Sequence, residues 1–226
     1  MAYFQYPTDA LYQKPLTKEA LLKHLTLTPE LKRALTDEIQ KIVWLYKLAP
    51  STTRLEAGER VPEFQIFQIT LKGETLNPEL LKAIDTAIPQ ITIFEIITPK
   101  ECYVTATHKR LDATKKKIIQ DSPYFQSPYY PLDKERKPLP TAITLEHLYE
   151  AILKSLMPAE IVPEAEVPIE VLLTQAEERR KLEAEIAKLN KQIRNEKQFK
   201  KRVALNEQLK QLKTQLNELK SVNKIV

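Results

Sequence analysis

The first part of the chain carries apolar residues at both strand-like and helix-like spacings. Residues 61–73 (VPEFQIFQITLKG) alternate between apolar and polar positions, and residues 101–110 alternate again, so both segments predict strands. The segment 90–98 (QITIFEIIT) is almost wholly apolar, which is typical of a strand covered on both faces. We therefore expect 90–98 at the buried centre of a sheet.

Helical spacing separates these strands. The periodicity predicts helices over 28–42, 77–88 and 144–156, the first two opened by a capping Thr28 or Asn77 followed by a proline. A strand, a helix and a strand in succession over 61–97 predict a right-handed parallel crossover. Together with a β-like stretch before Pro50, the pattern predicts an α+β domain over 1–157, with a mixed sheet of about four strands and flanking helices.

The last part of the chain has a different periodicity. Two apolar stripes occur at three-and-four spacing, and the interval from Ile193 to Leu209 places them out of heptad register. We therefore favour an antiparallel helical hairpin (a coiled coil) over 169–226, with its turn in the sequence NEKQFKKR. The alternative is one long helix in an intermolecular coiled coil. The stripes consist of Leu182, Ile186, Leu189 and Ile193, then Leu205, Leu209, Leu212, Leu216 and Leu219.

The two parts are separated by PAEIVPEAEVP, residues 158–168, which holds three prolines and three glutamates. Prolines at this spacing prevent a helix and favour an extended, fairly stiff connector. We place the domain boundary in this linker.

Charge is distributed unevenly over these parts. The net charge is +5, yet residues 1–168 hold 21 Lys and Arg against 22 Asp and Glu, whereas residues 169–226 hold 14 against 8. Within 188–202 seven cations face Glu196 alone, so the turn of the hairpin is expected to be a basic tip that attracts polyanions or an acidic protein face. The seven candidate nucleic-acid-binding residues are Lys188, Lys191, Arg194, Lys197, Lys200, Lys201 and Arg202.

Composition excludes several classes of site. Only two glycines occur, Gly58 and Gly73, so the clustered glycines of phosphate-binding loops are absent. A single cysteine, Cys102, excludes an internal disulfide and a multi-cysteine zinc site. We expect no cofactor and no metal. Because no apolar run approaches the ~18 residues of a membrane span, we also expect a cytoplasmic protein without membrane contact.

One weak catalytic pattern is present. A restriction-type nuclease needs an Asp and a Glu-x-Lys on adjacent strands to hold a metal ion and steady a water. Asp121 with Glu135 and Lys137 matches that spacing, but prolines crowd the segment. Asp85 with Glu95 and Lys100 is a looser match because the lysine is displaced.

An aromatic run, 124–130 (YFQSPYY), follows three lysines at 115–117. Such a run can stack on nucleic-acid bases if its rings are exposed, and the alternative is a proline-aromatic loop packed over the sheet. We favour the packed loop.

Several sequence blocks together resemble a known family. The segments TDEIQKIVWLYKLAPSTTRL, VPEFQIFQITLK, LLKAIDTAIP, LEHLYEAIL and NEKQFKKRVALNEQLKQLK are similar to the uncharacterised bacterial domain of unknown function numbered 4391. Members of that family are often encoded beside helicases and DNA methyltransferases, in restriction-type or phage-defence clusters. The resemblance therefore implies an accessory subunit with a larger protein partner such as a helicase or DNA methyltransferase, and it carries over no catalytic residues.

We therefore expect a non-enzymatic binding subunit of a bacterial DNA-processing or phage-defence system, which docks on a protein partner and contacts nucleic-acid phosphates through the basic tip. Two alternatives stay open. One is an assembly protein whose helical tail forms an oligomer without DNA contact, and the other is a metal-dependent nuclease.

Overall fold

A computed structural model divides the chain into two units, Met1–Leu156 and Met157–Val226. We refer to the first unit as the body and to the two long helices of the second as the hairpin. The structure describes residues 3–23, 25–114, 116–120, 122–158, 161–162 and 167–222. The linker predicted for 158–168 lies partly outside these residues.

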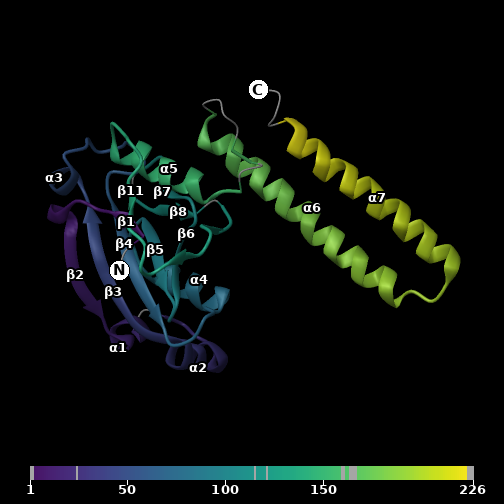
Figure 1. The fold of residues 1–226 in the computed structure, drawn as a ribbon, viewed down its shortest axis with the longest axis horizontal. Helices are drawn as coiled ribbons and strands as arrows, with labels where there is room; N and C mark the ends of the chain where they lie inside the picture. The colour runs from purple at the N-terminus through teal and green to yellow at the C-terminus, as the bar shows by residue number, and fades with distance from the viewer. Residues whose placement is uncertain are drawn as a thin grey trace. The chain divides into compact units, whose positions relative to one another are not determined.

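The body contains both helices and strands (Figure 1). Its helical elements are η1 (Thr8–Ala10), α1 (Lys18–Leu22), α2 (Pro29–Glu38), α3 (Pro50–Thr53), α4 (Pro78–Ala87) and α5 (Leu145–Leu156). Its strands are β1 (Phe4–Gln5), β2 (Leu11–Leu16), β3 (Ile39–Leu48), β4 (Phe64–Leu71), β5 (Thr92–Ile97), β6 (Glu101–Ala106), β7 (Lys109–Leu111), β8 (Ile118–Gln120), β9 (Phe125–Gln126), β10 (Tyr130–Pro131) and β11 (Lys137–Pro138).

The main sheet is mixed, which confirms the predicted α+β fold. Its strands follow the order β10-β6-β5-β4-β3-β2, with β9 also paired to β6. β4 and β5 run parallel and are joined through α4, whereas β5 and β6 form an antiparallel pair. Strands β3 to β6 are those that the hydrophobic pattern predicts. Every residue of β5 is buried, as expected for the central strand.

The structure extends this sheet to seven strands, with β2 at one edge and the two-residue strands β9 and β10 beside β6. β2 had no strand signal in the sequence because most of its side chains are exposed and it contains Pro15. Gln13, within β2, adopts a φ of 52°, and the pairing with β3 shifts register at that point. Such an irregularity is typical of an edge strand.

Two predicted helices begin at the expected caps. Thr28 Oγ1 accepts a hydrogen bond from the Leu31 N–H at 3.3 Å, and Asn77 Oδ1 accepts one from the Glu79 N–H at 2.9 Å. The helix predicted over 28–42 ends earlier, at Glu38, because β-branched residues from Ile39 onward join the sheet as β3.

One face of the sheet packs against α1, α2 and α4. The buried cluster includes Leu35 of α2, Leu80 and Ile84 of α4, and Ile69 and Phe94 of the sheet. The crossover helix α4 therefore covers the strands that it connects.

The second unit contains α6 (Ile169–Asn195) and α7 (Phe199–Val222), which contact each other along their lengths and run antiparallel (Figure 1). This arrangement confirms the hairpin, and the alternative of one long helix is wrong. Leu209 is buried, and the other residues of the two apolar stripes are half-buried while most of their neighbours are exposed. The stripes thus form the contact between α6 and α7. None of the helices in the described part of the chain is long and apolar enough to cross a membrane.

Candidate nucleic-acid interface

The turn of the hairpin is short. Residues 196–198 connect α6 to α7, within the segment where the apolar stripes break. The Glu196 Oε1 atom accepts a hydrogen bond from the Gln198 N–H at 2.7 Å, and the Glu196 N–H donates to the Gln192 carbonyl at 2.9 Å. We refer to residues 188–202 as the tip. The one carboxylate of the tip therefore helps to hold the connection in place.

All seven predicted cations of the tip are exposed. Lys188, Lys191 and Arg194 lie on the last two turns of α6, Lys197 lies in the connection, and the remaining three lie on the first turn of α7. Across the residues that the structure describes, none of the seven makes an ion pair with a carboxylate. Their positive charge is therefore not neutralised within the described chain.

The cations nearer the start of α6 differ from those of the tip. Arg179 Nε lies 2.8 Å from Glu183 Oε1, and Arg180 Nε lies 3.2 Å from Glu177 Oε2. Both pairs join residues three or four positions apart, which lie on one face of a helix. We refer to the residues of α6 and α7 outside 188–202 as the stem. Two arginines of the stem thus pair with carboxylates, whereas the tip has one carboxylate for seven cations.

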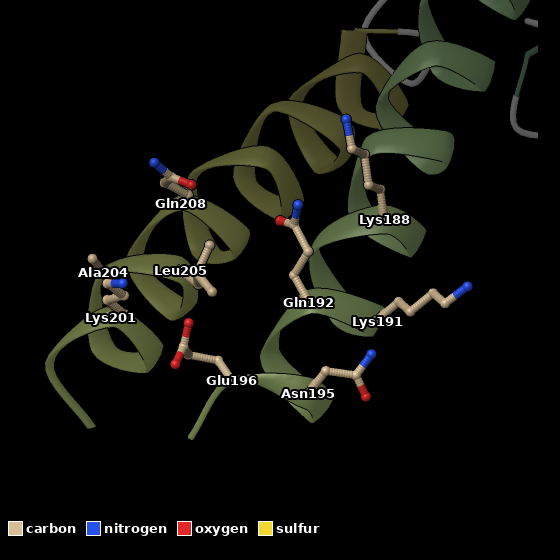
Figure 2. Close-up of a pocket in the computed structure, with 9 residues that line it drawn as sticks. All are labelled: Lys188, Lys191, Gln192, Asn195, Glu196, Lys201, Ala204, Leu205 and Gln208. Carbon is tan, nitrogen blue, oxygen red and sulfur yellow. The ribbon is translucent and has the colours of Figure 1, made fainter. Parts of the chain in front are cut away.

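A groove opens between the helices at the tip, with a volume of ≈ 650 Å³. Figure 2 shows Gln192 and Leu205 pointing into the space between the helices, while Lys191 extends away from α7. The groove is lined by three lysines, three amide side chains, one carboxylate and two apolar residues: Lys188, Lys191, Lys201, Gln192, Asn195, Gln208, Glu196, Ala204 and Leu205. Ammonium and amide N–H groups are hydrogen-bond donors that suit an anion.

The residues of the nuclease pattern have other surroundings. Asp121 lies outside the described residues. The Glu135 side chain is exposed, and its carbonyl accepts a hydrogen bond from the Tyr130 hydroxyl at 2.6 Å. Lys137 Nζ donates to the Tyr3 hydroxyl at 3.0 Å and lies over that ring. Among the described residues, no group of three or more His, Cys, Asp or Glu side chains could hold a metal ion.

The looser nuclease pattern also separates in the structure, because Asp85, Glu95 and Lys100 each take a different partner. Lys109 Nζ donates to Asp85 Oδ1 at 2.5 Å, and both side chains are buried. Lys100 instead pairs with Glu74 on the surface, at 2.6 Å.

Glu95 is fully buried on the central strand β5, and its Oε1 atom accepts a hydrogen bond from the Tyr3 N–H at 2.9 Å. Burial raises the pKa of Glu95 to about 7, and this effect outweighs the hydrogen bond from the Tyr3 N–H, which lowers the pKa. The sequence carries a signal for this burial, because Glu95 lies within the apolar run 90–98 that is expected at the centre of the sheet.

The aromatic run 124–130 packs onto the body rather than forming an open platform. The Tyr124 hydroxyl donates to Asp85 Oδ2 at 2.6 Å, and Phe125 is buried beside β6. Tyr129 is half-exposed and makes an edge contact with Tyr103. The packed-loop interpretation of this segment fits these contacts, although Lys115 lies outside the described residues.

Comparison with known proteins supplies a family and no function. A family model described as "Domain of unknown function (DUF4391)" matches residues 4–216, which include both the body and most of the hairpin. No curated protein and no solved structure matches the chain.

Proposed function

The chain belongs to the DUF4391 family, and we propose that it is a nucleic-acid-binding protein whose hairpin tip contacts phosphates. One observation carries this proposal: seven exposed cations lie within a three-residue connection and on the helix ends beside it, and none has an ion-pair partner among the described residues. The proposed role is binding rather than catalysis.

The arrangement of charge supports the tip as the place of contact. Residues 1–168 are almost neutral, so long-range attraction of a polyanion is concentrated on the hairpin. The tip cations come from the end of α6, from the connection and from the start of α7, and their free ammonium and guanidinium groups can each neutralise a phosphate. Contacts of this kind are weakly dependent on base sequence and strongly weakened by salt.

The salt dependence gives a quantitative expectation. If most of the seven cations contact phosphates of a duplex, log Kobs falls against log salt with a slope of up to about −6. A plot much flatter than about −2 would mean that at most two cations are engaged, and would contradict a tip-wide interface.

The decisive experiment reverses charges at the tip. We expect Lys200→Glu, Lys201→Glu and Arg202→Glu together to weaken binding of labelled duplex DNA roughly 100-fold at about 100 mM salt, because three phosphate contacts are lost. Fluorescence polarisation over a salt series measures both the affinity and the slope, which should become shallower by about 3.

A matched variant distinguishes the effect of where the charges are reversed from the effect of the change in net charge. Lys181, Lys210 and Lys213 are exposed hairpin lysines away from the connection. Their combined change to Glu alters the net charge by the same amount, and we expect it to weaken binding less than about fivefold, through long-range attraction alone. Equal losses in the two triple variants would show that binding is not localised at the tip.

A further inference from the structure

An apolar side chain lies exposed among the tip cations. Phe199, the first residue of α7, is 72% exposed, and Val203, one turn later, is 42% exposed. Single exposed apolar residues are common on protein surfaces, but this ring lies beside Lys200 and two residues after Lys197. The combination of an uncovered ring and flanking cations is the chemistry of single-strand recognition.

Helix geometry explains why the ring stays uncovered. Phe199 is six and ten residues before Leu205 and Leu209, so it is turned roughly 100° away from the stripe that faces α6. Arg202 and Val203 follow at three and four positions and share the face of α7 on which Phe199 lies. The ring is therefore presented to the surroundings next to a guanidinium group.

We propose that Phe199 stacks on an unpaired base and that the tip consequently prefers single-stranded to double-stranded nucleic acid. This inference rests on the proposed function, because it requires the phosphates to be held by the surrounding cations. In a duplex the bases are already stacked on one another, so inserting the ring costs the free energy of unstacking two of them. An unpaired base has a face that is available for stacking. Backbone phosphates on either side of that base would meet Lys197, Lys200 and Arg202.

The test compares two ligands and one side chain. We expect Phe199→Ala in the full chain to weaken binding of a labelled single strand about 5- to 100-fold, the range for loss of one base stack, and to change the affinity for a duplex less than about twofold. DNA and RNA strands of the same sequence form two arms, which distinguish these two sources of unpaired bases.

Two further variants make the result specific. Phe199→Trp should retain the affinity for the single strand. The fluorescence of the added tryptophan should be quenched on binding, whereas the fluorescence of Trp44 in the body should stay constant. Ile143→Ala is the matched control, because Ile143 is an equally exposed apolar residue of the body, at 76%, and its removal should leave both affinities unchanged.

The possible failures are distinguishable. If the triple charge reversal abolishes binding while Phe199→Ala leaves the affinity for the single strand unchanged, the stacking inference is wrong and the phosphate interface stands. An equal loss on single and double strands also overturns stacking. If the unmodified chain binds neither DNA nor RNA, both the interface and the stacking inference are overturned.

Discussion

Lysines occupy opposite environments in the body and at the tip of the hairpin. Lys109 is buried, and its Nζ atom donates to Asp85 Oδ1, to the Asp85 carbonyl and to Thr92 Oγ1 at 2.5, 3.0 and 3.1 Å. The lysines of the tip are exposed and have no ion pair within the described chain. The same residue type therefore contributes to folding in one region and is free for intermolecular contact in the other. Removing the charge of Lys109 should therefore lower the free energy of unfolding of the body. Removing the charge of a tip lysine should instead weaken the binding of a ligand.

The largest expected effect is on the body. Lys109→Met leaves the buried Asp85 carboxylate without its cation, so we expect the free energy of unfolding to fall by about 3–5 kcal/mol. Burial lowers the pKa of Lys109 while Asp85 raises it, which shows how closely the two charges depend on each other. Urea unfolding followed by the emission of Trp44, the one tryptophan of the chain, reports on the body directly.

The control is an ion pair of similar length on the surface. Lys100→Met breaks the exposed pair with Glu74 and should lower the free energy of unfolding far less than Lys109→Met does, because solvent screens the surface pair. The Lys109→Met variant, under conditions where it stays folded, should bind nucleic acid with the affinity of the unmodified chain, because its tip cations are unchanged. If the two substitutions lowered the free energy of unfolding equally, burial would not explain how much Lys109 contributes to stability.

A second effect concerns pH. The pKa of Glu95 is raised from 4.5 to about 7 in the folded chain, so the folded state binds its proton more tightly than the unfolded state. The stability contributed by protonated Glu95 is fully present below pH 4.5 and is lost as the pH rises towards and through about 7. The loss amounts to about 3 kcal/mol.

Urea unfolding at pH 5 and pH 8 measures this loss, and Glu95→Gln supplies the control because glutamine stays neutral at both. The variant should lack this part of the pH dependence and should be more stable than the unmodified chain at pH 8. Identical pH profiles for the two proteins would show that Glu95 is not the group responsible.

An intermediate effect concerns the contact between α6 and α7. Leu209 is 8% exposed, and we expect Leu209→Ala to destabilise the hairpin by about 2 kcal/mol through lost apolar contact. Hydrogen exchange resolves the effect by region: amides of α6 and α7 should exchange faster, whereas those of β4 and β5 should not change. Val203→Ala, at an exposed position of the same helix, should leave exchange unaltered.

The smallest effect is expected in the stem. Glu177→Gln removes the carboxylate beside Arg180 and Glu183→Gln removes the one beside Arg179, and each should change the free energy of unfolding by only about 0.5 kcal/mol. Thermal unfolding at low salt measures this change. A loss above about 2 kcal/mol would mean that ion pairs stabilise the hairpin more than its leucines do.

The architecture was largely predictable because local patterns specify it. Alternation in 61–73, the apolar run 90–98 and the caps Thr28 and Asn77 identified the central strands and helices, and the break between two leucine stripes identified the hairpin and its turn. The missing pieces were those without a local signal. β2 is an exposed edge strand whose pairing depends on β3, so its own residues do not alternate clearly.

The candidate site also has parts that the sequence predicts and parts that it does not. The cation cluster of the tip is contiguous in sequence and could be recognised from charge alone. Phe199 was not recognised as an exposed ring, because it lies in the segment predicted as the turn, and its angle to the stripe is defined only once α7 is known to begin at that residue. The Asp85–Lys109 pair was also hidden, since the two residues are 24 positions apart and meet only after α4 packs beside the sheet.

The absence of ion pairs among the tip cations, within the described chain, has an evolutionary consequence. No side-chain cation of the tip holds the described fold together, so substitutions there can add, remove or relocate charge without first being compensated elsewhere. Within one scaffold, the strength and preference of ligand recognition could then diverge by single steps. A change at Asp85 or Lys109, in contrast, would require a simultaneous change in its partner, which makes the interior the slowly changing part of the molecule.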